Sequence, residues 1–172
     1  PVIMSLDQIA ELKSHRSAGK KNRFFLARKA RERRNGWADR YETYDYLKNK
    51  SLFQRFDDAY LRSYVTYGFV PSPAGSIELL CPPEAEARIF ENYPLDIWEW
   101  PRRLKIPTLI IWGELSDVLS EETVTQFCDI CELSRSLMIE QTGHLIPMEK
   151  PDEIIHAIKQ FAMEGDTTGT AP

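Results

Sequence analysis

The sequence has few cysteines, no long apolar run and no strong excess of one charge. Three cysteines in 172 residues are an odd number, which argues against a disulfide framework and favours a reducing compartment. No stretch approaches the roughly 18 consecutive apolar residues of a membrane-spanning helix, and the N-terminus lacks the pattern of a secretory signal. We therefore expect a cytoplasmic protein without a membrane partner. With 42% hydrophobic residues and a net charge of −4, intrinsic disorder is not expected.

Two of the cysteines, Cys128 and Cys131, form a CxxC pair. Two thiols cannot close a four-ligand zinc site, and the sequence contains no second pair. With Val124 and Phe127 they follow the i, i+3, i+4, i+7 spacing of one helix face. We interpret both cysteines as core residues, and we predict neither a metal nor a cofactor.

Positive charge is concentrated in residues 20–34, where eight Lys and Arg residues accompany a single Glu. Such a run is typical either of a nucleic-acid or anionic surface, or of a solvated helix face. A nucleic-acid site would need stacking aromatics beside the charges, for which Phe24, Phe25 and Trp37 are candidates. We favour the solvated face and expect no nucleic-acid partner.

Residues 5–68 contain few glycines and no proline, and their apolar residues recur at helical spacing, which predicts a mainly helical region. Trp37, Tyr41 and Tyr44 form one predicted stripe, and Tyr64 is expected on the same side of a later helix as Leu61. These aromatics suit packing between helices and the lining of a substrate cavity equally well. Both interpretations stay open at this point.

Prolines and a glycine in residues 71–84 predict a loop with a short extended piece at 77–80, and a helix is expected at 84–92. From Pro107 the pattern changes to strand, helix, strand, helix. The strands are expected at 108–112 and 136–140, the first of them buried on both faces. The helices begin after Ser120 and at Pro151, and residues 165–172 are expected as a flexible tail.

This order predicts two parallel neighbouring strands joined by a right-handed crossover. Asp117 follows the first strand and His144 follows the second, so both loops should leave the same edge of the sheet. A hydrogen bond between the two side chains would make them the orienting acid and the base of a nucleophilic triad. A structural histidine is the alternative interpretation of His144.

Two segments carry a resemblance to a known family. PTLIIWGELSD, residues 107–117, and TGHLIPMEKPD, residues 142–152, are similar to the C-terminal motifs of α/β-hydrolase-fold proteins. The resemblance implies that Asp117 is the triad acid and His144 the general base. Asp117 stands four residues after Gly113, where many relatives have the acid at three.

The preceding region resembles the helical cap that such proteins insert after the sixth strand, and Pro1-Val2-Ile3 resembles the end of that strand. We accordingly expect an incomplete α/β-hydrolase fold: a mostly helical cap in residues 1–100 and the C-terminal part of a parallel sheet in residues 101–164. The resemblance implies that Trp37, Tyr41, Tyr44 and Tyr64 cover the active site and contact substrate.

The nucleophile that the family carries on a G-x-S-x-G turn is absent from these 172 residues, as is a loop that would form an oxyanion hole. The sequence therefore predicts the C-terminal portion of an esterase-like hydrolase acting on a small apolar substrate, inactive alone and completed by an N-terminal portion or a partner chain. The alternatives are a non-catalytic binding or interaction module and an inactive remnant of a hydrolase.

Overall fold

The computed structural model describes residues 3–20 and 23–167, and the chain divides into two compact units. One, called here the helical unit, is Leu6–Leu95; the other, the sheet unit, is formed by residues 96–167 together with residues 3–5. Within the sheet unit, the indole Nε1 of Trp98 donates to the carbonyl of Met4 at 3.0 Å. The strand end expected at Pro1-Val2-Ile3 falls, except for Ile3, outside the described residues.

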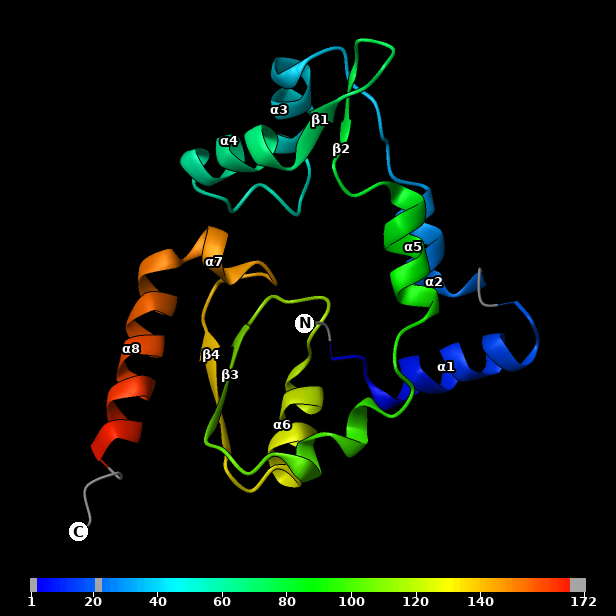
Figure 1. Cartoon of the computed structure of the whole chain (residues 1–172). Coiled ribbons are helices and arrows are strands. Elements are labelled where there is room, and N and C mark those ends of the chain that lie inside the picture. Colours follow the sequence, from blue (N-terminus) through cyan, green and yellow to red (C-terminus); the bar gives the residue numbers. More distant parts are fainter. Residues whose placement is uncertain (1–2, 21–22, 168–172) are drawn as a thin grey trace. The chain divides into compact units, whose positions relative to one another are not determined.

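The helical unit contains five helices and one hairpin among its described residues (Figure 1). Asp39 caps α3 by accepting from the backbone N–H of Glu42 at 2.8 Å, and Asp57 caps α4 in the same way through Ala59. In the hairpin, Gly75 takes a φ of +81°, which favours glycine over any other residue. The elements are α1 (Leu6–Ser17), α2 (Phe25–Arg31), α3 (Arg40–Lys48), α4 (Asp58–Tyr67), β1 (Phe69–Pro71), β2 (Ile77–Leu79) and α5 (Pro83–Glu91).

Aromatic and aliphatic side chains close a hydrophobic core inside this unit: Trp37, Leu47, Phe53, Leu61, Val65, Phe69 and Leu79. The prediction of one helical stripe is wrong. Trp37 precedes α3 and pairs through its backbone with Ile77, which turns its ring onto Phe69 at a centroid distance of 5.3 Å. Tyr41, on the first turn of α3, is 80% exposed.

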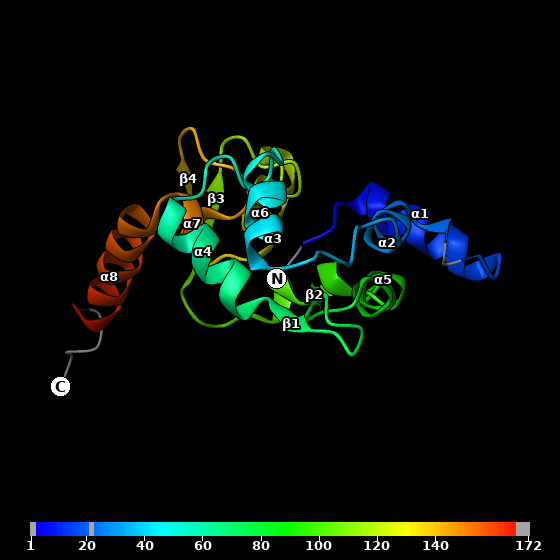
Figure 2. The ribbon, with the colours of Figure 1, turned by 90° about the horizontal axis from the view of Figure 1, so that it is seen from above.

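Several of the positively charged side chains in residues 20–34 form ion pairs within the helical unit. Arg31 on α2 contacts Glu84 at 2.7 Å and Glu91 at 2.8 Å, both on α5, and Arg33 pairs with Glu86 of the same helix. Figure 2 shows α2 and α5 side by side. These arginines therefore hold two helices together, and a nucleic-acid surface would have to compete with those pairs.

The sheet unit follows the predicted order of strand, helix, strand and helix. After 3₁₀ turns at Ile97–Glu99 and Pro101–Arg103 come β3 (Thr108–Gly113), α6 (Glu121–Ile130), β4 (Ser134–Ile139), α7 (Ile146–Glu149) and α8 (Pro151–Thr167). The strands pair in parallel, with Thr108 opposite Ser134 and Gly113 opposite Ile139. Figure 1 shows α6 on one side of the strands and α8 on the other.

The strands are less buried than their apolar sequence predicts. Only the last two residues of β3 are buried, and in β4 Leu137 and Met138 are 38% and 39% exposed. The physical reason is the size of the sheet: within the described residues β3 and β4 have only each other, so each strand leaves one edge unpaired. Helix α8 also includes residues 165–167 of the expected tail; residues 168–172 lie outside the described residues.

Candidate functional site

The loops that follow β3 and β4 lie against each other at the carboxyl edge of the sheet. The backbone N–H of Glu114 donates to Ile139 at 3.0 Å, and that of Leu115 donates to Thr142 at 2.9 Å. At Gly113 the approach is so close that a Cβ atom would lie 2.1 Å from the carbonyl oxygen of Gly143. Only glycine fits there, and this brings the segments carrying Asp117 and His144 together.

The turn before His144 is held by side chains on both sides. Gln141 has a φ of 53° and donates its backbone N–H to the carboxylate of Glu114 at 2.8 Å. Thr142 is fully buried, and the N–H of Gly143 donates to Glu149 of α7 at 2.7 Å. Glu149 thereby ties the end of α7 to the residue before His144 and fixes the backbone from which the imidazole projects.

The His144 ring is half-buried, and its hydrogen-bond partner among the described residues is Ser116, with Oγ 3.3 Å from Nδ1. Asp117 is exposed and makes no hydrogen bond to the ring within the described chain; it acts on His144 through its charge. Burial lowers the pKa of His144, and the negative charges of Asp117 and Glu149 oppose that shift without cancelling it. The ring is therefore a neutral base at neutral pH.

Ser116 is the residue of this cluster that the sequence analysis did not single out. Its signal is in the sequence: it stands three residues after Gly113, the offset at which the resemblance places the acid of many relatives. Asp117, one residue later, is displaced from that position. A hydroxyl therefore stands at the offset where many members of the resembled family carry a carboxylate.

The four predicted substrate contacts all belong to the helical unit, and they differ from one another. Trp37 is 3% exposed in the core, and Tyr64 stacks on Phe53 at a centroid distance of 5.4 Å. Tyr44 is partly buried and donates its hydroxyl to Asp58, whereas Tyr41 points into solvent. The structure thus gives Trp37 and Tyr64 a packing role; contact of any of the four with a substrate stays a prediction.

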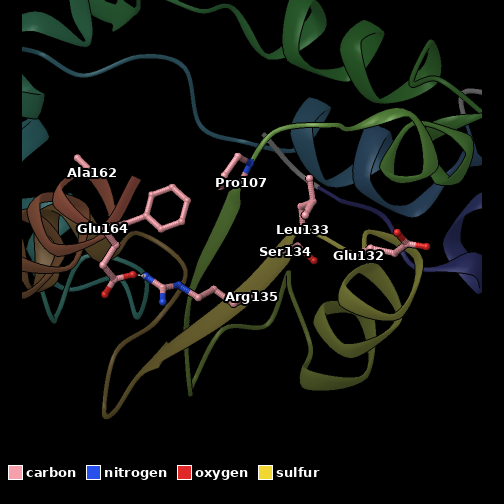
Figure 3. Close-up of a pocket in the computed structure, with 8 residues that line it drawn as sticks. Pro107, Glu132, Leu133, Ser134, Arg135, Ala162 and Glu164 are labelled. Carbon is pink, nitrogen blue, oxygen red and sulfur yellow. Dashed lines mark hydrogen bonds and ion pairs between the residues drawn. The ribbon is translucent and has the colours of Figure 1, made fainter. Parts of the chain in front are cut away.

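A pocket of about 480 Å³ lies at the opposite, amino end of the strands (Figure 3). Pro107 and Ser134, which precede and begin the two strands, line it. Arg135 crosses it toward α8, where it pairs with Glu164 and lies 5.2 Å from the ring of Phe161. This pocket is separate from the His144 site.

The described residues contain no group of three or more His, Cys, Asp or Glu placed to hold a metal ion. Cys131 is buried and Cys128 partly buried at the end of α6. Among these residues, no helix has the length and apolar character needed to cross a bilayer.

Comparison with known proteins gives the following relatives. No family model matches the chain. Lipase 1 of Psychrobacter immobilis is 32% identical over 82 residues, which cover 45% of this chain and 26% of the lipase. The crystal structure of E-2-(acetamidomethylene)succinate hydrolase superposes with a TM-score of 0.67 at 16% identity, covering 94% of this chain and 54% of the hydrolase.

A peroxisomal alpha-beta-hydrolase of Saccharomyces cerevisiae superposes equally well, with a TM-score of 0.67 at 16% identity over 86% of this chain and 41% of the yeast protein. At such identities the structural likeness concerns the fold alone. The chain spans about half the length of the solved structures and matches about a quarter of the lipase.

Proposed function

We propose that this chain, which is related to the α/β-hydrolase fold family, is part of an esterase-like hydrolase in which His144 is the general base. The fold is that of the family in part: a helical unit followed by two parallel strands with their helices. The name of the bacterial relative, a lipase, supports ester hydrolysis as the reaction class.

The observation that carries the proposal is the position and state of His144. Its loop leaves the carboxyl end of a parallel strand, the edge at which open α/β sheets place their functional groups. The ring is half-buried, carries a lowered pKa and lies in the field of the Asp117 carboxylate. A neutral imidazole with a nearby fixed negative charge can accept a proton and be stabilised as the imidazolium.

In the reaction, His144 would take the proton of a nucleophile and return it to the alcohol that leaves. The nucleophile itself has no candidate on a G-x-S-x-G turn in these 172 residues. We propose that an N-terminal portion or a partner chain supplies it, together with the oxyanion hole. The unpaired edge of β3 supports this, because a further parallel strand would bury an apolar strand that is now partly exposed.

The substrate we propose is a small apolar ester. Apolar and aromatic walls are the usual lining of pockets for such molecules, and the helical unit carries Tyr41 and Tyr44 at or near its surface. We also propose that the 172-residue chain is inactive alone. We propose a cytosolic location, which the three free cysteines support.

The first measurement is the intact mass of the protein purified from its source. A mass well above 20.0 kDa, with additional sequence carrying the nucleophile turn, is expected. A mass of 20.0 kDa without a partner chain would leave no nucleophile for the proposed reaction and would favour a binding module or an inactive remnant.

Turnover of a short-chain p-nitrophenyl ester by the natural protein tests the role of His144. His144→Ala should lower kcat by about 10³-fold or more, because triad members act as a unit. His156→Ala, at an exposed position on α8, is the matched control and should hydrolyse the ester as the natural protein does. Equal turnover by the His144→Ala variant would overturn the proposal.

A further inference from the structure

We propose that Ser116 is a positioning residue for His144: its hydroxyl donates to Nδ1, so that the neutral ring of the resting protein carries its proton on Nε2. The meaning of this arrangement for catalysis rests on the function proposed above. The arrangement itself rests on the contacts of the serine.

The hydroxyl of Ser116 is surrounded by three polar partners. The backbone N–H groups of Val118 and Leu119 donate to Oγ at 3.3 and 3.1 Å, and Nδ1 of His144 lies 3.3 Å away. The backbone of Ser116 is itself fixed, because its N–H donates to the carbonyl of Gly113 at 3.0 Å. The serine is thus held in a tight turn directly after β3, with its side chain half-buried against the imidazole.

Counting donors and acceptors assigns the proton. A serine hydroxyl has two lone pairs and one proton. Backbone N–H groups can only donate, so those of Val118 and Leu119 occupy the two lone pairs of Oγ. The hydroxyl proton remains, and the partner left for it is Nδ1 of His144. A neutral imidazole protonates one nitrogen only, so an accepting Nδ1 places the proton on Nε2.

Asp117 favours the opposite tautomer. A carboxylate only accepts, and an imidazole that donates from Nδ1 leaves Nε2 free to act as a base. In the structure, however, Asp117 makes no hydrogen bond to the ring within the described residues. The other carboxylate near the ring, Glu149, accepts from the backbone of Gly143. Ser116 is therefore the group in contact with Nδ1, and Asp117 the group that would have to replace it.

The consequence is a resting ring whose Nε2 already carries a proton, so that this nitrogen cannot accept another. General-base catalysis at Nε2 requires the proton on Nδ1, so His144 gains its basic form when Asp117 displaces the serine hydroxyl. A Ser116→Asp variant puts a carboxylate where the hydroxyl is and should hold the ring permanently in the basic tautomer. Ser116→Thr keeps a hydroxyl at the same place and should leave the tautomer unchanged.

The test is the tautomer of His144, measured by long-range ¹H–¹⁵N correlation in the natural protein labelled with ¹⁵N-histidine, at a pH where the ring is neutral. The expected spectrum of the natural protein and of Ser116→Thr shows an unprotonated Nδ1 and a protonated Nε2. In Ser116→Ala and Ser116→Asp the proton should move toward Nδ1. The exposed His156 provides the reference signal and should not change.

An Nδ1-protonated ring in the natural protein, or an unchanged tautomer in a folded Ser116→Ala variant, would overturn the inference. The natural protein alone decides it if the variants do not fold. This readout needs no turnover, so it separates the two proposals. The predicted tautomer without ester hydrolysis refutes the function only, whereas His144-dependent hydrolysis with the opposite tautomer refutes the role of Ser116 only.

Discussion

Leu61 in the helical unit and Leu137 in the sheet unit are the same side chain in opposite surroundings. Leu61, on α4, is 3% exposed and belongs to a core that includes Trp37 and Phe69. Leu137, in the middle of β4, is 38% exposed. The helical unit thus encloses a core of buried apolar side chains, whereas apolar side chains in the middle of β4 stay partly exposed.

The two units differ in where the partners of their elements lie in the described chain. Short-range elements of the helical unit, a hairpin and helix pairs, find their partners within about ninety residues of chain, and arginine–glutamate pairs join α2 to α5. A parallel strand, by contrast, gains its burial from neighbouring strands and from helices on both faces. Two strands cannot provide that for each other, and under the proposed function an N-terminal portion or a partner chain would provide it.

The largest effect that we expect is the difference in stability loss between truncation of Leu61 and truncation of Leu137. Leu61→Ala should destabilise the helical unit by about 2–5 kcal/mol, because it leaves a cavity in a closed core. Leu137→Ala should cost less than about 1 kcal/mol, because the side chain is already partly in water. Amide hydrogen exchange measures both, since it reports α4 and β4 separately.

The comparison would break if Leu137→Ala cost as much as Leu61→Ala. That result would mean that β4 is buried in the protein as purified, and the natural protein should then be compared with the isolated 172-residue chain. Tyr41→Ala, at a residue 80% exposed, is the control for truncation on the surface of the helical unit.

A smaller effect should be equal in the two units. Asp39 caps α3 by accepting from Glu42 at 2.8 Å, and Ser120 caps α6 by accepting from Thr123 at 3.3 Å. Replacing either by Ala should cost about 1 kcal/mol, since a cap is a local interaction that does not depend on how complete the unit is. Asp39→Asn and Ser120→Thr keep a capping oxygen and should restore most of the loss. Thermal unfolding of each pair of variants gives the comparison.

The pH dependence of stability should come mainly from the helical unit. The hydrogen bond from Arg31, with help from Arg88, lowers the pKa of Glu84 from its ordinary 4.5 to about 2. The folded state thus holds the ionised form more strongly than the unfolded state. Its contribution is present above pH 4.5 and is lost as the pH falls toward 2.

Glu84→Gln should flatten the acid side of the stability profile of α5, measured by hydrogen exchange between pH 5 and the acid limit. The exposed Glu132 of the sheet unit is the control, and Glu132→Gln should leave the profile of α5 as it is. A profile that is equally steep in Glu84→Gln would show that the pair with Arg31 is not what lowers this pKa. Because the pair is solvent-exposed, added salt should weaken the effect.

Much of the sheet unit was predictable from the sequence because its signals are local and strong. The apolar run 108–112 ending in a glycine, the serine before α6 and the proline that opens α8 each specify an element, and the parallel pairing follows from their order. The partial exposure of the strands was not predictable from the apolar run. Such a run indicates that a strand is suited to burial on both faces, but it does not say which segments cover it.

In the helical unit and at the candidate site, the sequence did not predict where individual side chains lie. The spacing of Trp37 and Tyr41 is helical, yet α3 begins at Arg40, and a backbone pairing with Ile77 orients the tryptophan instead. Likewise, Asp117 was the natural partner for His144 by residue type, but the loop after Gly113 brings Ser116 to the ring. Periodicity and motif spacing cannot resolve a shift of one residue in a loop, which is decided by backbone hydrogen bonds such as that from Ser116 to Gly113.

The two units also differ in what shifts the pKa values of their ionisable groups. Hydrogen-bonded ion pairs shift the pKa values of Arg31 and Glu84, whereas burial is the main cause that lowers the pKa of His144. Asp117 opposes that shift through its charge, so Asp117→Asn should lower the pKa of His144 further. An NMR titration of the ring measures it, with Asp129→Asn, at an exposed position on α6, as the matched control.

The lowered pKa of His144 also affects stability and activity. Because the pKa of His144 is lower in the folded state than the ordinary 6.5, its neutral form favours folding above that value, and this contribution is lost as the pH falls through 6.5 and below. The acid limb of the pH profile of ester turnover, where His144 becomes protonated, should move to lower pH in Asp117→Asn. The maximal rate should fall, since the imidazolium loses its stabilising charge. An unchanged pKa of His144 in Asp117→Asn would contradict this prediction, because it would mean that the charge of the carboxylate does not act on the ring.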